Sequence, residues 1–271
     1  MQPQKVIGVF DSGIGGTSIW KEIVTLLPLE STLYLADSKN APYGNKSEEQ
    51  IKQLCIKNTE KLIALGAKII VIACNTATTN AIDYLRATYP IPFIGIEPAI
   101  KPAALNSQNK SIGILATKGT LNSKLFHSTS EKYTQDIKVV EIIGEGLVSL
   151  IEKGDLENPE LSALLQTYLD PMLKARIDYL VLGCSHYPYL IPILKKLLPE
   201  HIQIIDSGEA VAKQTKNILE SNQLLNTTNQ NSSHQIFTNG DLDILNYFIN
   251  SFRESVNGNR HLDILVSKEV F

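Results

Sequence analysis

Two short stretches with the same pattern of residues constrain the fold of this chain most strongly. Val71–Thr76 (VIACNT) and Val181–His186 (VLGCSH) each begin with apolar residues, reach a cysteine and continue into a helix-like sequence. An apolar run of this kind followed by a helix is typical of a buried parallel strand and its crossover connection. Ligands of open α/β sheets bind at the carboxyl ends of the strands. Each stretch is therefore expected to present one thiol at such a crevice.

Strand-like and helix-like patterns alternate along the rest of the chain. One unit opens with the apolar run Lys5–Phe10, and a second unit with similar spacing opens at Ser111. This alternation predicts two doubly wound, pseudo-symmetric α/β domains with the active site in the cleft between them. Because the C-terminal segment follows the second unit, we expect it to return and cover the first.

Composition and charge exclude several classes of partner. The net charge of −3 gives no reason to expect binding to nucleic acid or to an anionic membrane surface. No apolar run approaches the roughly 20 residues of a membrane-spanning helix. The three cysteines, Cys55, Cys74 and Cys184, are odd in number and lack CxxC spacing. This pattern argues against a disulfide framework and favours a reducing, cytoplasmic location.

Cys74 and Cys184 are the candidate chemical groups. Both are expected at strand ends beside helix N-termini, where the helix dipole stabilises a thiolate. A modest depression from the usual cysteine pKa of about 8.5 would leave one thiolate and one thiol near neutrality. Two thiols that face one bound molecule would suit proton exchange from opposite sides. Inert packing and metal binding remain alternatives, and Cys55, inside a predicted helix, is expected to be an inert core residue.

Short polar residues accompany the two thiols. Asp11 belongs to the unit that carries Cys74, and His186 lies two residues beyond Cys184, so each could exchange a proton with its neighbouring thiol. Helix capping and simple packing are the competing interpretations. Four further residues at the strand ends either hold small carboxylates or cap helices: Ser12, Asn75, Thr76 and Ser185.

Cofactor motifs are incomplete in this sequence. The turn Asp11–Gly16 and the downstream Asp37 resemble a dinucleotide site, but Ser18 replaces the third glycine and Asp11 would repel a pyrophosphate. A Cys-x-His zinc site would need a second ligand pair, which the spacing does not provide. Apart from Lys118 nearby, the motif loops offer no Schiff-base lysine. We therefore expect neither a metal nor a cofactor.

Four motifs occur in a fixed order from residue 7 to about residue 220. They are Asp11–Gly16 (DSGIGG), Ala36-Asp37 with Pro42-Tyr43-Gly44, Ala73–Ala77 (ACNTA) and Gly183–Pro188 (GCSHYP). Together they resemble the glutamate racemase family. The resemblance implies a cofactor-independent enzyme that interconverts L- and D-glutamate and supplies D-glutamate for bacterial peptidoglycan. It also implies a homodimer and domains of about 1–97 plus 208–271, and 98–207.

The resemblance also implies roles for individual residues. Cys74 and Cys184 would be the two bases, with Asp11, Glu152 and His186 assisting them. Substrate contacts would come from the same motifs, through Asp11, Ser12, Pro42, Tyr43, Gly44, Cys74, Asn75, Thr76, Cys184, Ser185 and His186.

Two departures from the family pattern limit this resemblance. Ser185 stands where the family usually has threonine, and Ile143–Leu147 lacks the Ala-Cys-Pro pattern common before the glutamate that aligns with Glu152. Two rival functions also stay open at this point. One is a related racemase acting on aspartate or another small acid. The other is a non-catalytic role, such as a small-anion sensor or an inhibitory partner of another protein.

Overall fold

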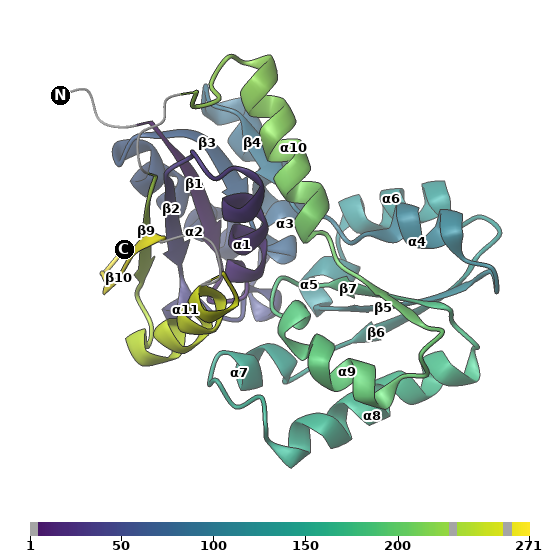
Figure 1. Ribbon diagram of the computed structural model, residues 1–271. Helices are drawn as coiled ribbons and strands as arrows, with labels where there is room; N and C mark the ends of the chain where they lie inside the picture. The colour runs from purple at the N-terminus through teal and green to yellow at the C-terminus, as the bar shows by residue number, and fades with distance from the viewer. Residues whose placement is uncertain (1–4, 228–231, 257–261) are drawn as a thin grey trace.

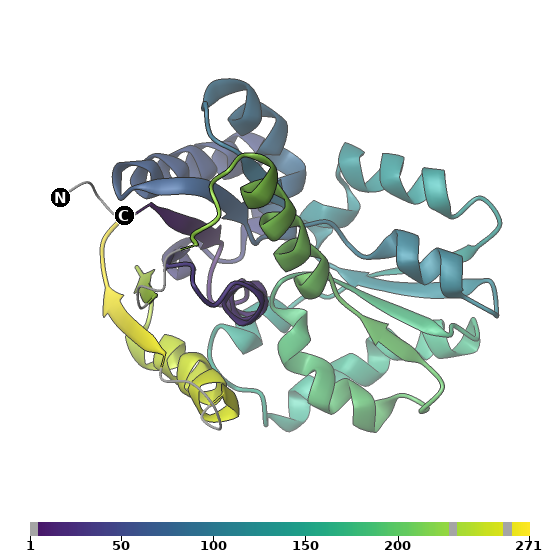
Figure 2. The same cartoon turned by 45° about the horizontal axis from the view of Figure 1, so that its top comes forward.

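The computed structural model describes residues 5–227, 232–256 and 262–271. The chain forms two lobes that lie side by side, each built around its own parallel sheet (Figures 1 and 2). No helix in the described ranges is both long and apolar enough to cross a membrane.

In the described part of the chain, the first sheet has six parallel strands in the order β10-β9-β2-β1-β3-β4. They are β1 (Val6–Asp11), β2 (Thr32–Ala36), β3 (Ala67–Ile72), β4 (Phe93–Gly95), β9 (Ser233–Thr238) and β10 (Asp263–Lys268). Because β9 pairs with β2, the C-terminal segment returns to the first lobe.

Helices cover both faces of the first sheet. Ile7 and Val9 of β1 pack in one apolar cluster and Phe10 in another, since successive side chains of a strand point to opposite faces. This burial on both faces explains the unbroken apolar run that predicted the strand. One face carries α1 (Thr17–Leu26), α10 (Gly208–Ser221) and α11 (Leu242–Val256), and the other carries α2 (Glu48–Ala64) and α3 (Asn75–Thr88). The β2–α2 connection contains two short 3₁₀ helices, η1 (Ser38–Asn40) and η2 (Tyr43–Asn45).

The second lobe is smaller but built in the same way. Its described strands run in the order β6-β5-β7-β8, all parallel. They are β5 (Ser111–Ala116), β6 (Lys138–Ile143), β7 (Tyr179–Gly183) and β8 (Gln203–Ile205). One face is covered by α4 (Ile100–Asn106), α5 (Lys118–Leu121) and α6 (Lys124–Tyr133). The other is covered by α7 (Leu147–Ile151), α8 (Pro159–Lys174), η3 (Tyr187–Leu190) and α9 (Ile191–Leu197).

The two sheets share one strand order, which confirms the predicted pair of pseudo-symmetric, doubly wound units. In each, the first strand of the unit lies between the second and the third, as in β2-β1-β3-β4 and β6-β5-β7-β8. The strand order therefore reverses between β1 and β3 in one lobe and between β5 and β7 in the other. Ligands of such sheets bind at the carboxyl edge next to this reversal.

The chain crosses between the lobes after β4 and again after β8. The Ser207 hydroxyl donates a short hydrogen bond to the carbonyl oxygen of Glu97, which ties the two crossings together. One apolar cluster runs from the α1, α10 and α11 face of the first lobe to the α7, α8 and α9 face of the second. The predicted domain limits, 1–97 plus 208–271 and 98–207, fall at these crossings and stay a prediction.

Candidate functional site

Cys74 lies at the carboxyl end of β3 and is the N-cap residue of α3. Its sulfur accepts a hydrogen bond from the Ala77 N–H at 3.4 Å and contacts the Ser12 hydroxyl at 3.6 Å. The strand therefore delivers the thiol, and the loop after the neighbouring strand β1 holds it in place.

The surroundings of Cys74 correct one expectation from the sequence. Burial raises the pKa of the Cys74 thiol well above its usual value, and the charge of Asp11 raises it further. Hydrogen bonds from Ala77 and Ser12 oppose this shift without overcoming it. The prediction of a depressed pKa from the helix dipole is wrong for this closed arrangement, because loss of hydration outweighs the dipole.

Cys184 lies at the matching position after β7. Its sulfur is 3.8 Å from Nδ1 of His186. The first helical turn after it is the 3₁₀ helix η3, and α9 begins only at Ile191. The expectation that a regular helix N-terminus stabilises this thiol is therefore wrong.

Asp11 organises the glycine-rich turn that follows β1. One carboxylate oxygen accepts hydrogen bonds from the N–H groups of Gly13 (3.3 Å) and Gly16 (2.8 Å), and the other accepts one from the Ser185 hydroxyl of the second lobe (3.2 Å). Burial raises the pKa of Asp11, and the nearby His186 opposes that shift. The N–H groups that would cradle a phosphate in a dinucleotide site thus bind the protein's own carboxylate.

Glu152 and His186 reach the same turn from the second lobe. Glu152 Oε1 lies 2.5 Å from His186 Nε2 and accepts a hydrogen bond from the Ile14 N–H at 2.7 Å. The backbone nitrogen of Gly15 also lies 3.3 Å from His186 Nε2. We place a proton on His186 Nε2 and assign its hydrogen bond to Glu152, because that contact is much shorter. Burial alone would lower the pKa of His186, but hydrogen bonds to Cys184 and Glu152 outweigh it and raise the pKa well above its ordinary value.

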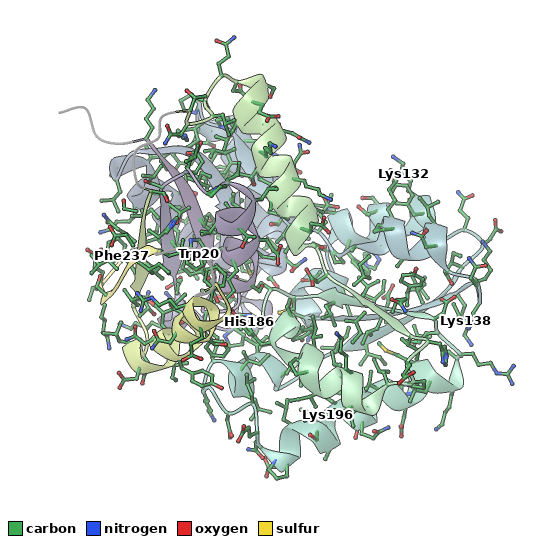
Figure 3. All side chains as sticks on the ribbon, viewed as in Figure 1. Trp20, Lys132, Lys138, His186, Lys196 and Phe237 are labelled. Carbon is green, nitrogen blue, oxygen red and sulfur yellow. The ribbon has the colours of Figure 1, made fainter. Side chains whose placement is uncertain are left out.

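Glu152 and His186 approach the turn after β1 so closely that only glycine fits at positions 13 and 15. A Cβ atom on Gly13 would lie 1.9 Å from Glu152 Oε1, and one on Gly15 would lie 2.2 Å from His186 Nδ1. The glycines therefore make room for side chains of the other lobe. Figure 3 shows His186 at the junction of the two lobes.

The divergent segment before Glu152 is held by two tyrosines. The Tyr187 hydroxyl donates to the Gly144 carbonyl at 3.2 Å, and the Tyr168 hydroxyl donates to the Glu145 carbonyl at 2.9 Å. This anchored loop leads into α7, whose C-cap residue is Glu152. The absence of the Ala-Cys-Pro pattern therefore does not displace Glu152 from the site.

Both thiols line one small cavity. Its free volume is about 10 Å³, roughly the minimum that holds a single water molecule. Ten of the predicted residues line it, together with two others; the lining is Ser12, Pro42, Tyr43, Gly44, Cys74, Asn75, Thr76, Thr117, Val148, Cys184, Ser185 and His186. Asp11 and Glu152 are not in this lining and act on it through Ser185 and His186. Cys55 lies elsewhere, in α2, where burial raises its pKa.

Two lining residues, Thr117 and Val148, were missed by sequence reasoning. Thr117 follows β5 just as Ser12 follows β1, and its hydroxyl hydrogen-bonds that of Thr76 at 2.8 Å. The similarity between residues 111–120 and residues 7–13 could have identified it. Val148 carries no such signal, because an apolar residue in a short helix is usual in a core.

The side-chain amide of Asn75 indicates what kind of ligand the cavity accepts. It is buried, and within the described residues neither Oδ1 nor Nδ2 has a hydrogen-bond partner. A buried amide without a partner costs free energy, so it is usually retained where a ligand completes it. The cavity is therefore suited to a small polar molecule.

Comparison with known proteins identifies the family. The Asp/Glu/Hydantoin racemase profile matches residues 7–215. The chain belongs to this family. A glutamate racemase of Ectopseudomonas mendocina is 46% identical over 242 residues, which cover 89% of this chain and 92% of that protein. One of Cupriavidus pinatubonensis is 48% identical over 208 residues, covering 77% and 76% of the two chains. The chain is accordingly an amino-acid racemase, an isomerase.

Solved structures of the family have the same two-lobed fold. Escherichia coli glutamate racemase, in complex with L-glutamate and the activator UDP-MurNAc-ala, superposes with a TM-score of 0.82 at 30% identity, covering 97% of this chain and 99% of that one. The isoform RacE1 of Bacillus anthracis gives 0.81 at 31% identity, covering 97% and 98%. An aspartate racemase of Picrophilus torridus gives 0.53 at 19% identity, covering 80% and 94%, and so shares the fold alone.

Proposed function

We propose that this racemase interconverts L- and D-glutamate without a cofactor, with Cys74 and Cys184 as its two bases. The observation that carries the proposal is geometric: two thiols from equivalent positions of two pseudo-symmetric lobes line one cavity. Inversion at Cα requires a proton to leave one face and another to arrive at the opposite face. A single base cannot easily serve both faces, whereas a pair of thiols can.

The proton balance is simple. One cysteine, as thiolate, takes the α-proton and becomes a thiol, while the other, as thiol, gives its proton to the opposite face and becomes a thiolate. The carbanionic charge that develops is stabilised by the hydrogen-bond donors around the cavity. Because burial and Asp11 raise the pKa of Cys74, a thiolate there needs a compensating positive charge. The α-ammonium group of the substrate supplies that charge on binding.

The auxiliary residues divide between the two thiols. The His186 imidazolium, held by Glu152, lies beside Cys184 and can donate or receive a proton on that side. Asp11 lies on the Cys74 side, where its charge acts on that thiol. Each enantiomer would therefore meet a different acid–base pair.

The rest of the lining would bind the two carboxylates of glutamate. Asn75 offers an unpaired amide, and Ser12, Thr76, Thr117 and Ser185 offer hydroxyl groups. Among the residues described as lining the cavity there is no arginine, so recognition depends on neutral donors. A cavity of about 10 Å³ cannot contain an amino acid, so the lobes must separate to admit the substrate and close around it.

The cellular role follows from the resemblance to glutamate racemases. We assign the enzyme to supply of D-glutamate for peptidoglycan, in the cytoplasm, as a homodimer whose protomers have the domain limits given above. The relatives named glutamate racemase, each at least 44% identical over three quarters or more of this chain, support glutamate over aspartate as the substrate. A non-catalytic anion-binding role would leave the pairing of the two thiols unexplained.

A racemisation assay over a panel of amino acids tests the substrate directly. Protein dialysed against a chelator should racemise glutamate with no addition and show no visible absorbance from pyridoxal phosphate. Aspartate should be turned over much more slowly. Activity that requires added metal, pyridoxal phosphate or nicotinamide would refute cofactor independence, and faster turnover of aspartate would refute the substrate assignment.

A further inference from the structure

Asp37 is a buried carboxylate that the proposed mechanism does not use. It lies directly after β2 and is 2% exposed. Its oxygens accept hydrogen bonds from the Tyr43 hydroxyl (2.5 Å), the Asn239 amide (2.5 Å) and the Asn40 amide (2.8 Å). Among the ion pairs of the described residues, none includes Asp37. The residue that resembles a ribose-binding acid in the sequence is thus fully engaged inside the lobe.

The donors converge on Asp37 from two separate parts of the first lobe, the β2–α2 connection and the end of β9. Asn239 follows β9 and also accepts a hydrogen bond from the Lys39 N–H at 2.9 Å, so it holds both the carboxylate and the connection beside it. A buried carboxylate without a cationic partner is costly unless its oxygens are hydrogen-bonded. A network of this kind fixes the geometry of every group that joins it.

Tyr43 is the group through which this network reaches the cavity. Its ring is buried in the same apolar cluster as Cys74 and lines the cavity. Its hydroxyl donates to Asp37 and accepts from the Asn58 amide of α2 at 3.2 Å. Burial, together with the Asp37 carboxylate, raises the pKa of Tyr43, so the hydroxyl stays protonated. Contact with a ligand is left to the ring and main chain of Tyr43 and to Gly44.

We propose that Asp37, held by Asn239, is a positioning residue that fixes Tyr43 and with it the Pro42–Gly44 wall of the substrate cavity. The inference rests on the proposed function and extends it to the C-terminal strand β9. The wall carries no proton-transfer group, so its contacts with the substrate are the same in the ground state and in the transition state. Loss of such contacts raises KM and leaves kcat nearly unchanged.

Asp37→Asn tests this role, and Asp178→Asn is its matched control. Asp178 is also a buried carboxylate with three hydrogen bonds, from the Ser107 hydroxyl and the N–H groups of Gln108 and Asn109, but it lies at the amino end of β7. We expect Asp37→Asn to raise KM for glutamate about tenfold, the effect of one lost hydrogen bond to a charged group. Its kcat should change little. Asp178→Asn should lower Tm without changing KM.

A double-mutant cycle with Tyr43→Phe separates positioning from a general loss of stability. If Asp37 acts through the Tyr43 hydroxyl, Asp37→Asn should add little to KM in the Tyr43→Phe background. Asn239→Ala should raise KM in the same direction and provides the test if Asp37→Asn does not fold. Additive effects in the cycle, or an equal KM increase in Asp178→Asn, would overturn the inference. A wild-type protein inactive on glutamate would instead overturn the proposed function.

Discussion

The two lobes place equivalent thiols in opposite electrostatic surroundings. Cys74 lies at a helix N-cap beside the buried carboxylate of Asp11, whereas Cys184 lies before a 3₁₀ turn beside the histidine that Glu152 holds. The backbone is pseudo-symmetric, and the chemistry is not. Because the two faces of Cα see different partners, the two directions of the reaction should depend on different residues.

Removing either thiol should have the largest effect and most directly tests the comparison. Cys74→Ala and Cys184→Ala should each abolish racemisation, because one face of Cα then has no base. The resemblance to glutamate racemases implies that Cys184 acts on L-glutamate and Cys74 on D-glutamate, and we predict the same for this enzyme. In heavy water, Cys74→Ala should therefore still exchange the α-hydrogen of L-glutamate, and Cys184→Ala that of D-glutamate, as followed by proton NMR.

Cys55→Ala is the control for this experiment and should behave as wild type, since Cys55 is packed inside the first lobe. Near wild-type racemisation by either single variant would refute the two-thiol mechanism. Exchange that favours the opposite enantiomers would preserve the mechanism and reverse the assignment of faces.

The next effect in size concerns the unlike partners, Asp11 and His186. Asp11→Asn and His186→Asn should lower kcat by roughly 10- to 10⁴-fold, the range of a general acid or base. L- and D-glutamate have equal free energies, so kcat/KM must stay equal in the two directions for every variant. The asymmetry should therefore appear in kcat and in the isotope effect on α-deuterated L- or D-glutamate. Variants with unchanged rates would return both residues to purely structural roles.

The sequence predicts the symmetric part of the site and misses much of the asymmetric part. Strands buried on both faces are unbroken apolar runs, so the ends of β3 and β7, and hence both cysteines, could be located. The raised pKa of Cys74 could not be predicted from the sequence, because it depends on burial by segments that are distant in sequence. The approach of Glu152 to Ile14, across 138 residues, is likewise a property of the packed lobes.

Glu152→Gln should have the smallest effect on catalysis. It sharpens the comparison of the two thiols because it changes the charge on the Cys184 side alone. Glutamine is close to glutamate in size and can still accept the hydrogen bond from Ile14, so mainly the charge beside His186 is lost. The pKa of His186 should then fall, because an adjacent negative charge no longer favours the imidazolium. The alkaline limb of the kcat profile should move to lower pH, while kcat at the optimum falls less than in His186→Asn.

The same variant makes a prediction about stability. A histidine whose folded pKa is raised stabilises the fold below its unfolded pKa of about 6.5, and that contribution is lost as pH rises through the folded value. The difference in Tm between wild type and Glu152→Gln should therefore be largest between about pH 5 and 6.5. It should shrink as pH climbs through the raised pKa of His186. A pH-independent difference would show that Glu152 contributes only packing, and that the charge on the Cys184 side has another source.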